Sequence, residues 1–224
     1  GGRAVTAPPP AITADRPLAP LTSWKIGGPA AFFAEPADAP ALAACLEFAE
    51  ARRLPVLALG GGTNLLIADE GYPGLVVRCG ARQWAIEDQA GEEARVRAGA
   101  RAPFAALARA LAQSGWAGLE WAEGIPGTVG GATVGNAGAY GGDLASICVE
   151  CATWSKADGL RRRPAAALEF GYRRSLLSGQ DPTGLFALET ILLVRRDDPE
   201  RLAARLRELG AHRRARTPVG LSCG

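Results

Sequence analysis

Apolar residues recur at helical spacing in three segments of this chain. Between residues 38 and 53 they follow Asp38, a residue type that caps helix N-termini by accepting backbone N–H bonds. A second apolar stripe covers residues 103–113, and Gly115, two residues after it, is a typical helix stop. A third stripe begins after Asp198 and carries leucines on one face. We therefore predict three amphipathic helices at these positions.

Shorter apolar or alternating runs between these helices predict strands. They are "VLALG" (56–60), "GLVVRC" (74–79), "WAIE" (84–87), "ARVRAGA" (94–100), "SICVECATW" (146–154) and "LFALETILLVRR" (185–196). The mixture indicates an α+β fold with one unit over residues 14–80 and another over 81–196. The proline-rich residues 1–13 are expected to form a disordered lead-in, and residues 197–224 to begin a further domain.

The stretch "GIPGTVGGATVGNAGAYGG", residues 124–142, is rich in glycine and nearly uncharged. A flexible linker with this much glycine normally carries serine and charged residues, which are scarce here. Ile125, Val129 and Val134 favour burial instead. We interpret the stretch as a packed loop whose backbone closely approaches a ligand, with a flexible linker as the alternative.

The segment "LGGGTNLL", residues 59–66, carries the same signal in a shorter form. Consecutive backbone N–H groups in a glycine turn can form a concave nest for an anionic group such as phosphate. The segment has neither the Gly-Lys-Ser/Thr ending of a P-loop nor a GxGxxG pattern opening a helix. Taken alone it is also compatible with a simple tight turn. Two glycine loops in different units favour a long ligand between them, such as a flavin dinucleotide.

Composition and charge exclude several classes of protein. The 224 residues are 48% hydrophobic and 21% charged, which is typical of a globular protein with a sizeable core. The net charge of +2 gives no electrostatic case for nucleic acid or an anionic membrane, and no apolar run approaches the roughly 20 residues of a membrane span. Nothing indicates an extended interface, so we expect a monomer. Arg213, Arg214 and Arg216 are interpreted as a solvated helix end.

Five scattered cysteines are typical of a reducing compartment, and we expect a cytoplasmic location. Cys148 and Cys151 form a single CxxC, which has a redox or metal-binding interpretation. They lie in a predicted strand, where side chains alternate between faces, so residues three apart are expected to point in opposite directions. We therefore expect neither a metal site nor a redox role for this pair.

Four motifs occur in an order and at a spacing that are typical of one enzyme family. They are "TSWKIGGPA" (22–30), "LGGGTNLLIADEGYPGLVV" (59–77), "GLEWAEGIPGTVGGATVGNAGAYGG" (118–142) and "FGYRRS" (170–175). From about residue 17 to its C-terminus the chain resembles the UDP-N-acetylenolpyruvoylglucosamine reductase family, also called UDP-N-acetylmuramate dehydrogenase or MurB. The third motif is highly specific.

The resemblance implies a two-subdomain FAD-binding fold of the PCMH type with noncovalent FAD. It also implies that NADPH delivers hydride to the flavin. The reduced flavin then passes hydride to UDP-N-acetylglucosamine enolpyruvate, which gives UDP-N-acetylmuramate for peptidoglycan synthesis. The sole histidine, His212, lies far in sequence from both glycine stretches, which agrees with a flavin that is not tethered through histidine.

By resemblance, residues 60–66 should hold the pyrophosphate of FAD, and residues 124–131 with 136–141 should line the flavin. The cofactor-binding residues expected in this way are Gly60, Gly61, Gly62, Thr63, Asn64, Leu65, Gly124, Ile125, Pro126, Gly127, Thr128, Gly130, Gly131, Asn136, Ala137, Gly138, Tyr140 and Gly141. No metal-binding residues are expected.

Arg173 matches the catalytic arginine of the family, and Tyr172 is expected to contact the substrate or Arg173. Hydride addition to a C=C bond conjugated to a carboxylate builds negative charge on that carboxylate. A fixed guanidinium stabilises this charge more in the transition state than in the ground state. Taken alone, "YRRS" is also compatible with a surface turn around a buried tyrosine. The other motifs favour the catalytic interpretation.

The chain departs from the family pattern at "LSCG", which ends at Gly224, directly before the position of the family's proton-donating serine. Ser222 is not the matching residue. We expect the third, substrate-binding domain to be largely missing, and the chain to bind FAD but to turn over slowly or not at all. Two other hypotheses stay open, namely another PCMH-type FAD oxidoreductase such as a sugar-acid oxidase, and a catalytically silent FAD-binding fragment.

Overall fold

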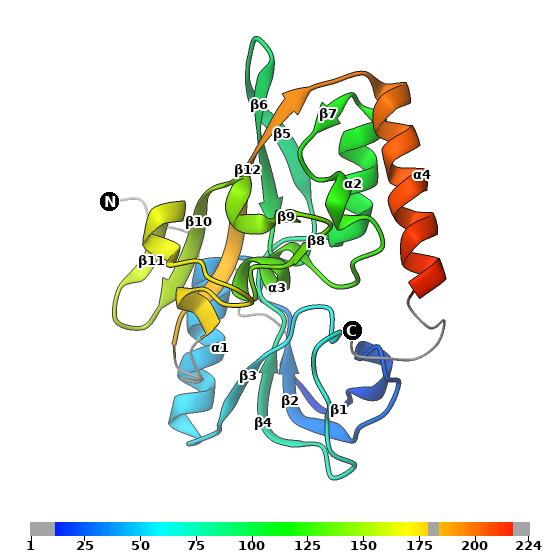
Figure 1. Ribbon diagram of the computed structural model, residues 1–224. Helices are drawn as coiled ribbons and strands as arrows, with labels where there is room; N and C mark the ends of the chain where they lie inside the picture. The colour runs from blue at the N-terminus through cyan, green and yellow to red at the C-terminus, as the bar shows by residue number, and fades with distance from the viewer. Residues whose placement is uncertain (1–11, 179–183, 217–224) are drawn as a thin grey trace, which may run out of the picture.

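The computed structural model describes residues 12–178 and 184–216, which are built around two β-sheets (Figure 1). Residues 1–11 of the lead-in expected over residues 1–13 lie outside the described part of the chain, and so does Ser222. The α+β fold class is confirmed. Among the described residues, no helix combines the length and the apolar character that crossing a bilayer requires.

The smaller sheet takes its four strands from the N-terminal part of the chain, in the order β1-β2-β4-β3. The strands are β1 (Thr13–Pro17), β2 (Pro29–Ala34), β3 (Val56–Ala58) and β4 (Tyr72–Val77). Both β2 and β3 run parallel to β4, whereas β1 is antiparallel to β2. β2 and β3 lie on either side of β4 and run in the same direction, so they need a crossover connection, which helix α1 (Ala39–Ala51) provides.

Helix α1 begins where its sequence predicts. The Asp38 side chain accepts a hydrogen bond from the N–H of Ala41 at 2.9 Å and thereby caps the first turn. Leu42 and Cys45 on its inner face are buried together with Leu75 of β4. This face joins the helix to the smaller sheet.

The larger sheet is antiparallel, in the order β11-β10-β12-β6-β5, with β7 paired to the far end of β12. Its strands are β5 (Trp84–Ala90), β6 (Glu93–Gly99), β7 (Trp116–Ala117), β10 (Cys148–Ser155), β11 (Gly159–Pro164) and β12 (Phe186–Arg196). β12 is the centre of this sheet and its longest strand, which agrees with its nearly continuous apolar sequence. A separate two-stranded ribbon joins β8 (Gly138–Ala139) and β9 (Gly142–Asp143).

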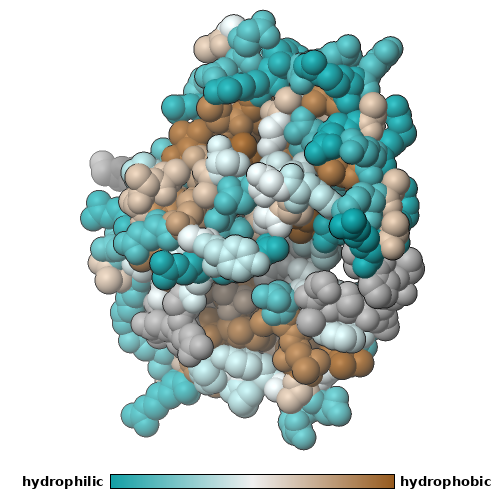
Figure 2. Space-filling model, in the orientation of Figure 1, coloured by the Kyte–Doolittle hydropathy of each residue, from teal (hydrophilic) through white to brown (hydrophobic). Residues whose placement is uncertain are grey.

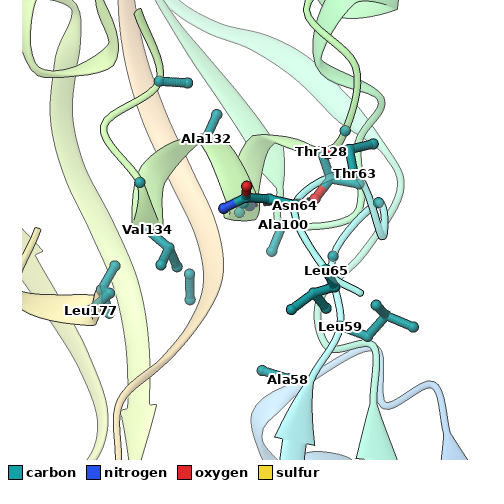
Figure 3. Close-up of a pocket in the computed structure, with 18 of the residues that line it drawn as sticks. Ala58, Leu59, Thr63, Asn64, Leu65, Ala100, Thr128, Ala132, Val134 and Leu177 are labelled. Atoms are coloured by element: carbon teal, nitrogen blue, oxygen red, sulfur yellow. Dashed lines mark hydrogen bonds between the residues drawn. The ribbon is translucent and has the colours of Figure 1, made fainter. Parts of the chain in front are cut away.

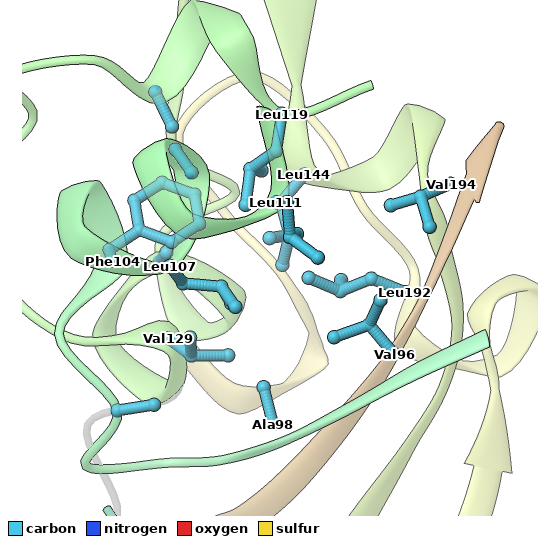
Figure 4. Packing of buried hydrophobic residues seen from close by; sticks show 14 of the residues in the cluster. Val96, Ala98, Phe104, Leu107, Leu111, Leu119, Val129, Leu144, Leu192 and Val194 are labelled. Carbon is cyan, nitrogen blue, oxygen red and sulfur yellow. The ribbon is translucent and has the colours of Figure 1, made fainter. Parts of the chain in front are cut away.

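The main hydrophobic core lies between helix α2 (Phe104–Gln113) and one face of the larger sheet. Leu107 and Leu111 of α2 pack among Val96 of β6 and Leu192 of β12 (Figure 4). Helix α4 (Pro199–Arg216) lies on the outer side of α2, as Figure 1 shows. The short 3-10 helices are η1 (Ala19–Leu21), η2 (Glu120–Ala122), η3 (Leu144–Ser146), η4 (Ala165–Leu168) and η5 (Leu176–Ser178).

The glycine-rich stretch 124–142 is packed, and the flexible-linker alternative is wrong. It is not a loop throughout, because Val129–Val134 form helix α3. The Thr128 side chain accepts from the N–H of Gly131 at 3.4 Å, and Val129 and Thr133 of the helix are buried. An N-cap threonine and buried β-branched residues outweigh the low helix propensity of the two glycines.

The expectation that Cys148 and Cys151 point in opposite directions is wrong. Both thiols are buried in one cluster with Leu168 and Leu177. The register of β10 shifts between Cys148 and Glu150, and such an irregularity resets the alternation of side chains. Burial raises the pKa of Cys148 to about 12 and that of Cys151 to about 11, so both stay protonated at neutral pH.

Candidate functional site

A cavity of about 810 Å³ is lined by residues of both sheets and of their connections. One wall comes from the end of β3 and the glycine turn after it, residues 56–65. The opposite wall comes from residues 125–139, η5 and the start of β12. Figure 2 shows apolar surface in the recess across the middle of this face of the molecule. The two predicted glycine stretches thus meet at one site.

The turn at residues 60–65 offers free backbone donors. Arg78 Nε donates to the Gly60 carbonyl at 3.3 Å, and the Ser23 N–H donates to the Gly62 carbonyl at 3.0 Å. In a trans peptide the N–H points opposite to the C=O. The N–H of Gly61 shares a peptide with the Gly60 carbonyl, and that of Thr63 with the Gly62 carbonyl, so both N–H groups point away from Arg78 and Ser23. No N–H in the turn donates to a backbone carbonyl of the described residues. Unpaired backbone N–H groups in a glycine turn can bind an anionic group.

Glycine is required in this turn because other backbone lies against it. A Cβ on Gly61 would lie 2.6 Å from the Cα of Gly127, and a Cβ on Gly62 would lie 2.1 Å from the carbonyl oxygen of Leu21. Gly62 and Gly127 also have φ of +66° and +109°, a conformation that side chains disfavour. The two glycine stretches therefore touch each other directly, in addition to lining the cavity.

The beginning of α3 is tied to the larger sheet's unit and offers fewer free donors. The N–H of Val129 donates to the Ala102 carbonyl, and the N–H of Gly130 donates to the Ala100 carbonyl, both at 2.9 Å. These bonds satisfy two of the N–H groups that a helix N-terminus leaves free. The start of α3 therefore contributes fewer free backbone donors to the site than residues 60–65 do.

The other end of the cavity is apolar. Ala132 and Val134 of α3 and Leu177 of η5 line it. Figure 3 shows Val134 and Leu177 on the side opposite Asn64 and Leu65. A cavity with a polar nest at one wall and aliphatic side chains at the other suits a ligand with a phosphate-bearing part and a flat aromatic part.

Arg173 stands at the tip of a tight turn that borders this cavity. Gly171 and Arg174 exchange backbone hydrogen bonds of 3.0 and 3.2 Å across the turn. Arg173 has φ of +55°, an unusual conformation for a residue with a side chain, and such strain is concentrated at functional sites. The Nδ2 of the buried Asn136 donates to the Gly171 carbonyl at 3.0 Å and thereby fixes the first residue of the turn.

A second cavity of about 280 Å³ adjoins the first, and Arg173 lines both of them. Tyr172 lines its edge with 91% of its surface exposed, which does not match the alternative of a surface turn around a buried tyrosine. The Arg173 guanidinium carbon lies 5.8 Å from the centre of the Tyr172 ring. Tyr140, also in this cavity, packs edge-on against His212 of α4 with ring centres 5.2 Å apart. His212 is thus close to the glycine-rich stretch despite its distance in sequence.

The structure brings most of the expected residues to the larger cavity. Lining it are Gly60, Gly61, Gly62, Thr63, Asn64, Leu65, Ile125, Pro126, Gly127, Thr128, Gly130, Gly131, Ala137, Gly138 and Arg173. Asn136, Tyr140, Gly141 and Tyr172 line the smaller cavity only. Gly124 lines neither, because its open side faces the Cδ of Arg213, 2.8 Å from where a Cβ would lie.

Sequence patterns missed several residues of the larger cavity. Arg101, Cys79 and Arg213 line it. The interpretation of Arg213 as part of a solvated helix end is therefore wrong for this residue. Arg213 reaches the cavity because α4 packs across α2 and η2. No local signal identifies these residues, since their positions depend on contacts between distant segments.

The residues present fit FAD. The glycine nest provides donors for a pyrophosphate, the tight glycine contacts leave the backbone exposed to a ligand, and the aliphatic wall suits the flavin ring. Among the described residues, no group of three or more histidine, cysteine, aspartate or glutamate side chains is arranged to hold a metal ion.

Comparison with known proteins agrees with this geometry. Residues 30–163 match the family model described as an FAD binding domain. The UDP-N-acetylenolpyruvoylglucosamine reductase of Chloroflexus aggregans is 40% identical over 218 residues, which are 96% of this chain and 73% of that protein. The enzyme of that name from Caulobacter sp. strain K31 is 41% identical over 93% of this chain and 66% of its own length.

Solved structures show the same fold. The crystal structure of UDP-N-acetylenolpyruvylglucosamine reductase (MurB) from Thermus caldophilus matches with a TM-score of 0.74 and 29% identity, over 96% of this chain and 73% of that one. A solvent-stable cholesterol oxidase matches with a TM-score of 0.61 at 16% identity, over 84% of this chain and 38% of that one, and this likeness concerns the fold alone.

The fold and the site define an FAD-binding flavoprotein of the oxidoreductase class. Within that class, the chain belongs to the UDP-N-acetylenolpyruvoylglucosamine reductase (MurB) family. The resemblance seen in the four motifs is thereby confirmed. The chain spans about 73% of the length of the first relatives it matches.

Proposed function

We propose that this chain performs, at the slow turnover expected from its sequence, the FAD-dependent reduction of UDP-N-acetylglucosamine enolpyruvate to UDP-N-acetylmuramate, with NADPH as hydride donor, for peptidoglycan precursor synthesis. The observation that carries the proposal is the position of Arg173. It stands where the cavity lined by the glycine turn adjoins a second cavity. A substrate in the second cavity would meet both the guanidinium and the cofactor site.

The proposed cofactor ligands divide the larger cavity by chemistry. The N–H groups of residues 60–65 would hold the pyrophosphate, while Ile125, Val134 and Leu177 would pack against the ring system. When bound, FAD supplies hydride transfer from the nicotinamide to the substrate double bond. The chain's own residues bind and orient it and exclude water from the apolar wall.

Arg173 would bind the carboxylate of the enolpyruvyl group. Hydride addition at the conjugated C=C bond moves negative charge onto that carboxylate, so the attraction to the guanidinium strengthens toward the transition state. Asn136 fixes the turn through Gly171, which places the guanidinium before the substrate arrives. Tyr172 lies beside Arg173 and would contact the substrate at the cavity edge.

We further propose a cytoplasmic monomer whose residues 14–80 and 81–196 act as the two FAD-binding subdomains. The separate sheets support this division, because one contains β1 to β4 and the other contains β5, β6, β7, β10, β11 and β12. The scattered cysteines, all four described ones free, support a reducing compartment.

Two measurements test the proposal. Anaerobic mixing of the FAD-loaded protein with NADPH should bleach the visible flavin spectrum, because this half-reaction needs no sugar substrate. Adding the UDP-sugar enol ether should then restore the oxidised spectrum without oxygen. Reoxidation by oxygen alone, with no response to the enol ether, would instead assign the chain to the oxidases of this fold. A flavin that NADPH cannot reduce would contradict the proposed hydride donor.

A further inference from the structure

The larger cavity contains a guanidinium to which the proposed function gives no role. Arg101 lines the cavity directly after Ala100, and only 13% of its side chain is exposed. Its Nε–H is buried and has no hydrogen-bond partner among the described residues. A buried charged donor without an acceptor costs free energy, so such a group normally has a ligand or water as its partner.

Charge around Arg101 is unbalanced. One carboxylate, Glu35, serves two arginines, because its Oε1 lies 2.7 Å from Arg101 Nη2 and 3.2 Å from Arg78 Nη1. Two guanidinium groups and one carboxylate leave one positive charge. Burial lowers the pKa of Arg78, Glu35 opposes this, and the positive charges of Arg101 and Arg82 lower it further. An anion nearby would relieve this crowding of positive charge.

The same pair of arginines is joined to the glycine nest. Arg78 donates to the carbonyl of Gly60 through Nε, and it reaches Glu35 through Nη1. Glu35 in turn pairs with Arg101, which lines the same cavity as Gly60. The surplus charge and the free backbone donors therefore belong to one continuous arrangement around one cavity.

We propose that Arg101 binds the pyrophosphate of FAD and supplies the positive charge that the uncharged backbone donors of residues 60–65 lack. This inference rests on the proposed function, since it takes FAD as the ligand of the larger cavity. A guanidinium is suited to the role because it stays protonated and forms charge-assisted hydrogen bonds with phosphate oxygens. The phosphates of NADPH are a second source of the same chemistry, and the test separates the two.

The test compares FAD binding by the apo-protein with that of Arg101→Gln, Arg101→Lys and the control Arg82→Gln. Arg82 lies near enough to influence Arg78, yet it is exposed and does not line the cavity. In Arg101→Gln, Glu35 keeps Arg78 as its partner, so no carboxylate is left unpaired. Titration with FAD at several salt concentrations, followed by flavin fluorescence, gives the dissociation constants, and circular dichroism confirms folding.

Arg101→Gln should weaken FAD binding by about ten- to hundred-fold and flatten its salt dependence. Arg101→Lys should keep the salt dependence with a smaller loss of affinity, and Arg82→Gln should stay within about two-fold of the parent. Riboflavin, which lacks the phosphates, should bind the parent and Arg101→Gln equally.

A failure of the proposed function and a failure of the role of Arg101 give different results. If the parent protein binds no FAD, the proposed function is wrong. If the parent binds FAD and Arg101→Gln binds it equally tightly with the same salt dependence, only the role of Arg101 is wrong. An unchanged FAD affinity with a raised KM for NADPH would assign Arg101 to the nicotinamide donor and overturn the proposal. Should Arg101→Gln not fold, Arg101→Lys decides, because FAD affinity equal to that of the parent contradicts a direct guanidinium–phosphate contact.

Discussion

Gly61 and Gly127 belong to different units of the fold, yet a Cβ on Gly61 would lie 2.6 Å from the Gly127 Cα. The open side of Gly127 faces Thr63, whose Oγ1 would lie 2.9 Å from a Cβ there. The two glycine-rich stretches thus lie against each other where they line the cavity. Their glycines serve contact between the two backbones as well as contact with a ligand.

Gly61→Ala should therefore separate the two stretches. The added methyl meets backbone that cannot rotate away, and overpacking of this kind costs about 1–3 kcal/mol. We expect a lower Tm of the apo-protein and FAD affinity reduced by about ten-fold or more. The matched control for the Tm is Gly131→Ala, whose Cβ would meet only the Thr128 Oγ1, at 3.7 Å. Because Gly131 lines the cavity, this control is read on the Tm and not on FAD affinity. A parental Tm for Gly61→Ala, measured by calorimetry, would show that the contact is not tight in solution.

Arg173→Gln should separate the two half-reactions. Reduction of the bound flavin by NADPH needs no carboxylate partner and should continue near the parental rate. Transfer to the enol ether should fall by about 10²–10³, the usual cost of removing one group that stabilises developing negative charge. Stopped-flow absorbance measures both steps. Arg174→Gln is the control, because Arg174 is an adjacent exposed arginine that lines neither cavity.

Asn136→Ala should loosen the turn that presents Arg173. The substitution removes the donor to the Gly171 carbonyl and the acceptor for the Ala145 N–H, both partly buried groups, and losing each hydrogen bond costs about 1 kcal/mol. We expect a lower Tm together with a lower kcat for the enol ether. If Asn136 only stabilised the fold, kcat measured well below the Tm would remain parental, and the positioning role would be wrong.

The buried thiols should make stability fall at alkaline pH. Burial raises the pKa of Cys45 and Cys151 to about 11, well above the usual value for a thiol. Because the folded pKa lies above the unfolded one, the stabilising contribution is complete below about pH 9 and is lost as the pH rises toward 11. Thermal melts across this range should show Tm decreasing. Rapid reaction of these cysteines with a thiol reagent in the folded protein near pH 8 would contradict their burial.

Local sequence patterns predicted the helices and strands that carry a clear local signal, such as a capping residue or a long apolar run. Helix α1 has its Asp38 cap, and β12 is a long apolar run, so both appear where expected. Strand β11, "GLRRRP", was not predicted, because it is an edge strand whose arginines do not alternate with apolar residues. Strand β2, "PAAFFA", was not predicted either, because it is a short apolar run in which hydrophobic and polar residues do not alternate.

The candidate site was predictable only where a motif carried it. The turn at 60–65 and the turn at Arg173 follow from quoted motifs, and the structure places them around one cavity. The positions of Arg101 and Arg213 at the cavity depend on the packing of distant segments, which no local pattern encodes. The direct contact of the two glycine stretches is a tertiary fact of the same kind.

The central claim is that residues 60–65 and 125–139 enclose an FAD site. The most direct measurement is the visible absorption spectrum of the purified protein, before and after incubation with FAD and removal of free cofactor. The account predicts a flavin spectrum at close to one FAD per chain, together with a higher Tm, because a ligand that binds only the native state stabilises it. A well-folded protein that remains colourless in excess FAD and shows no shift in Tm would contradict the account.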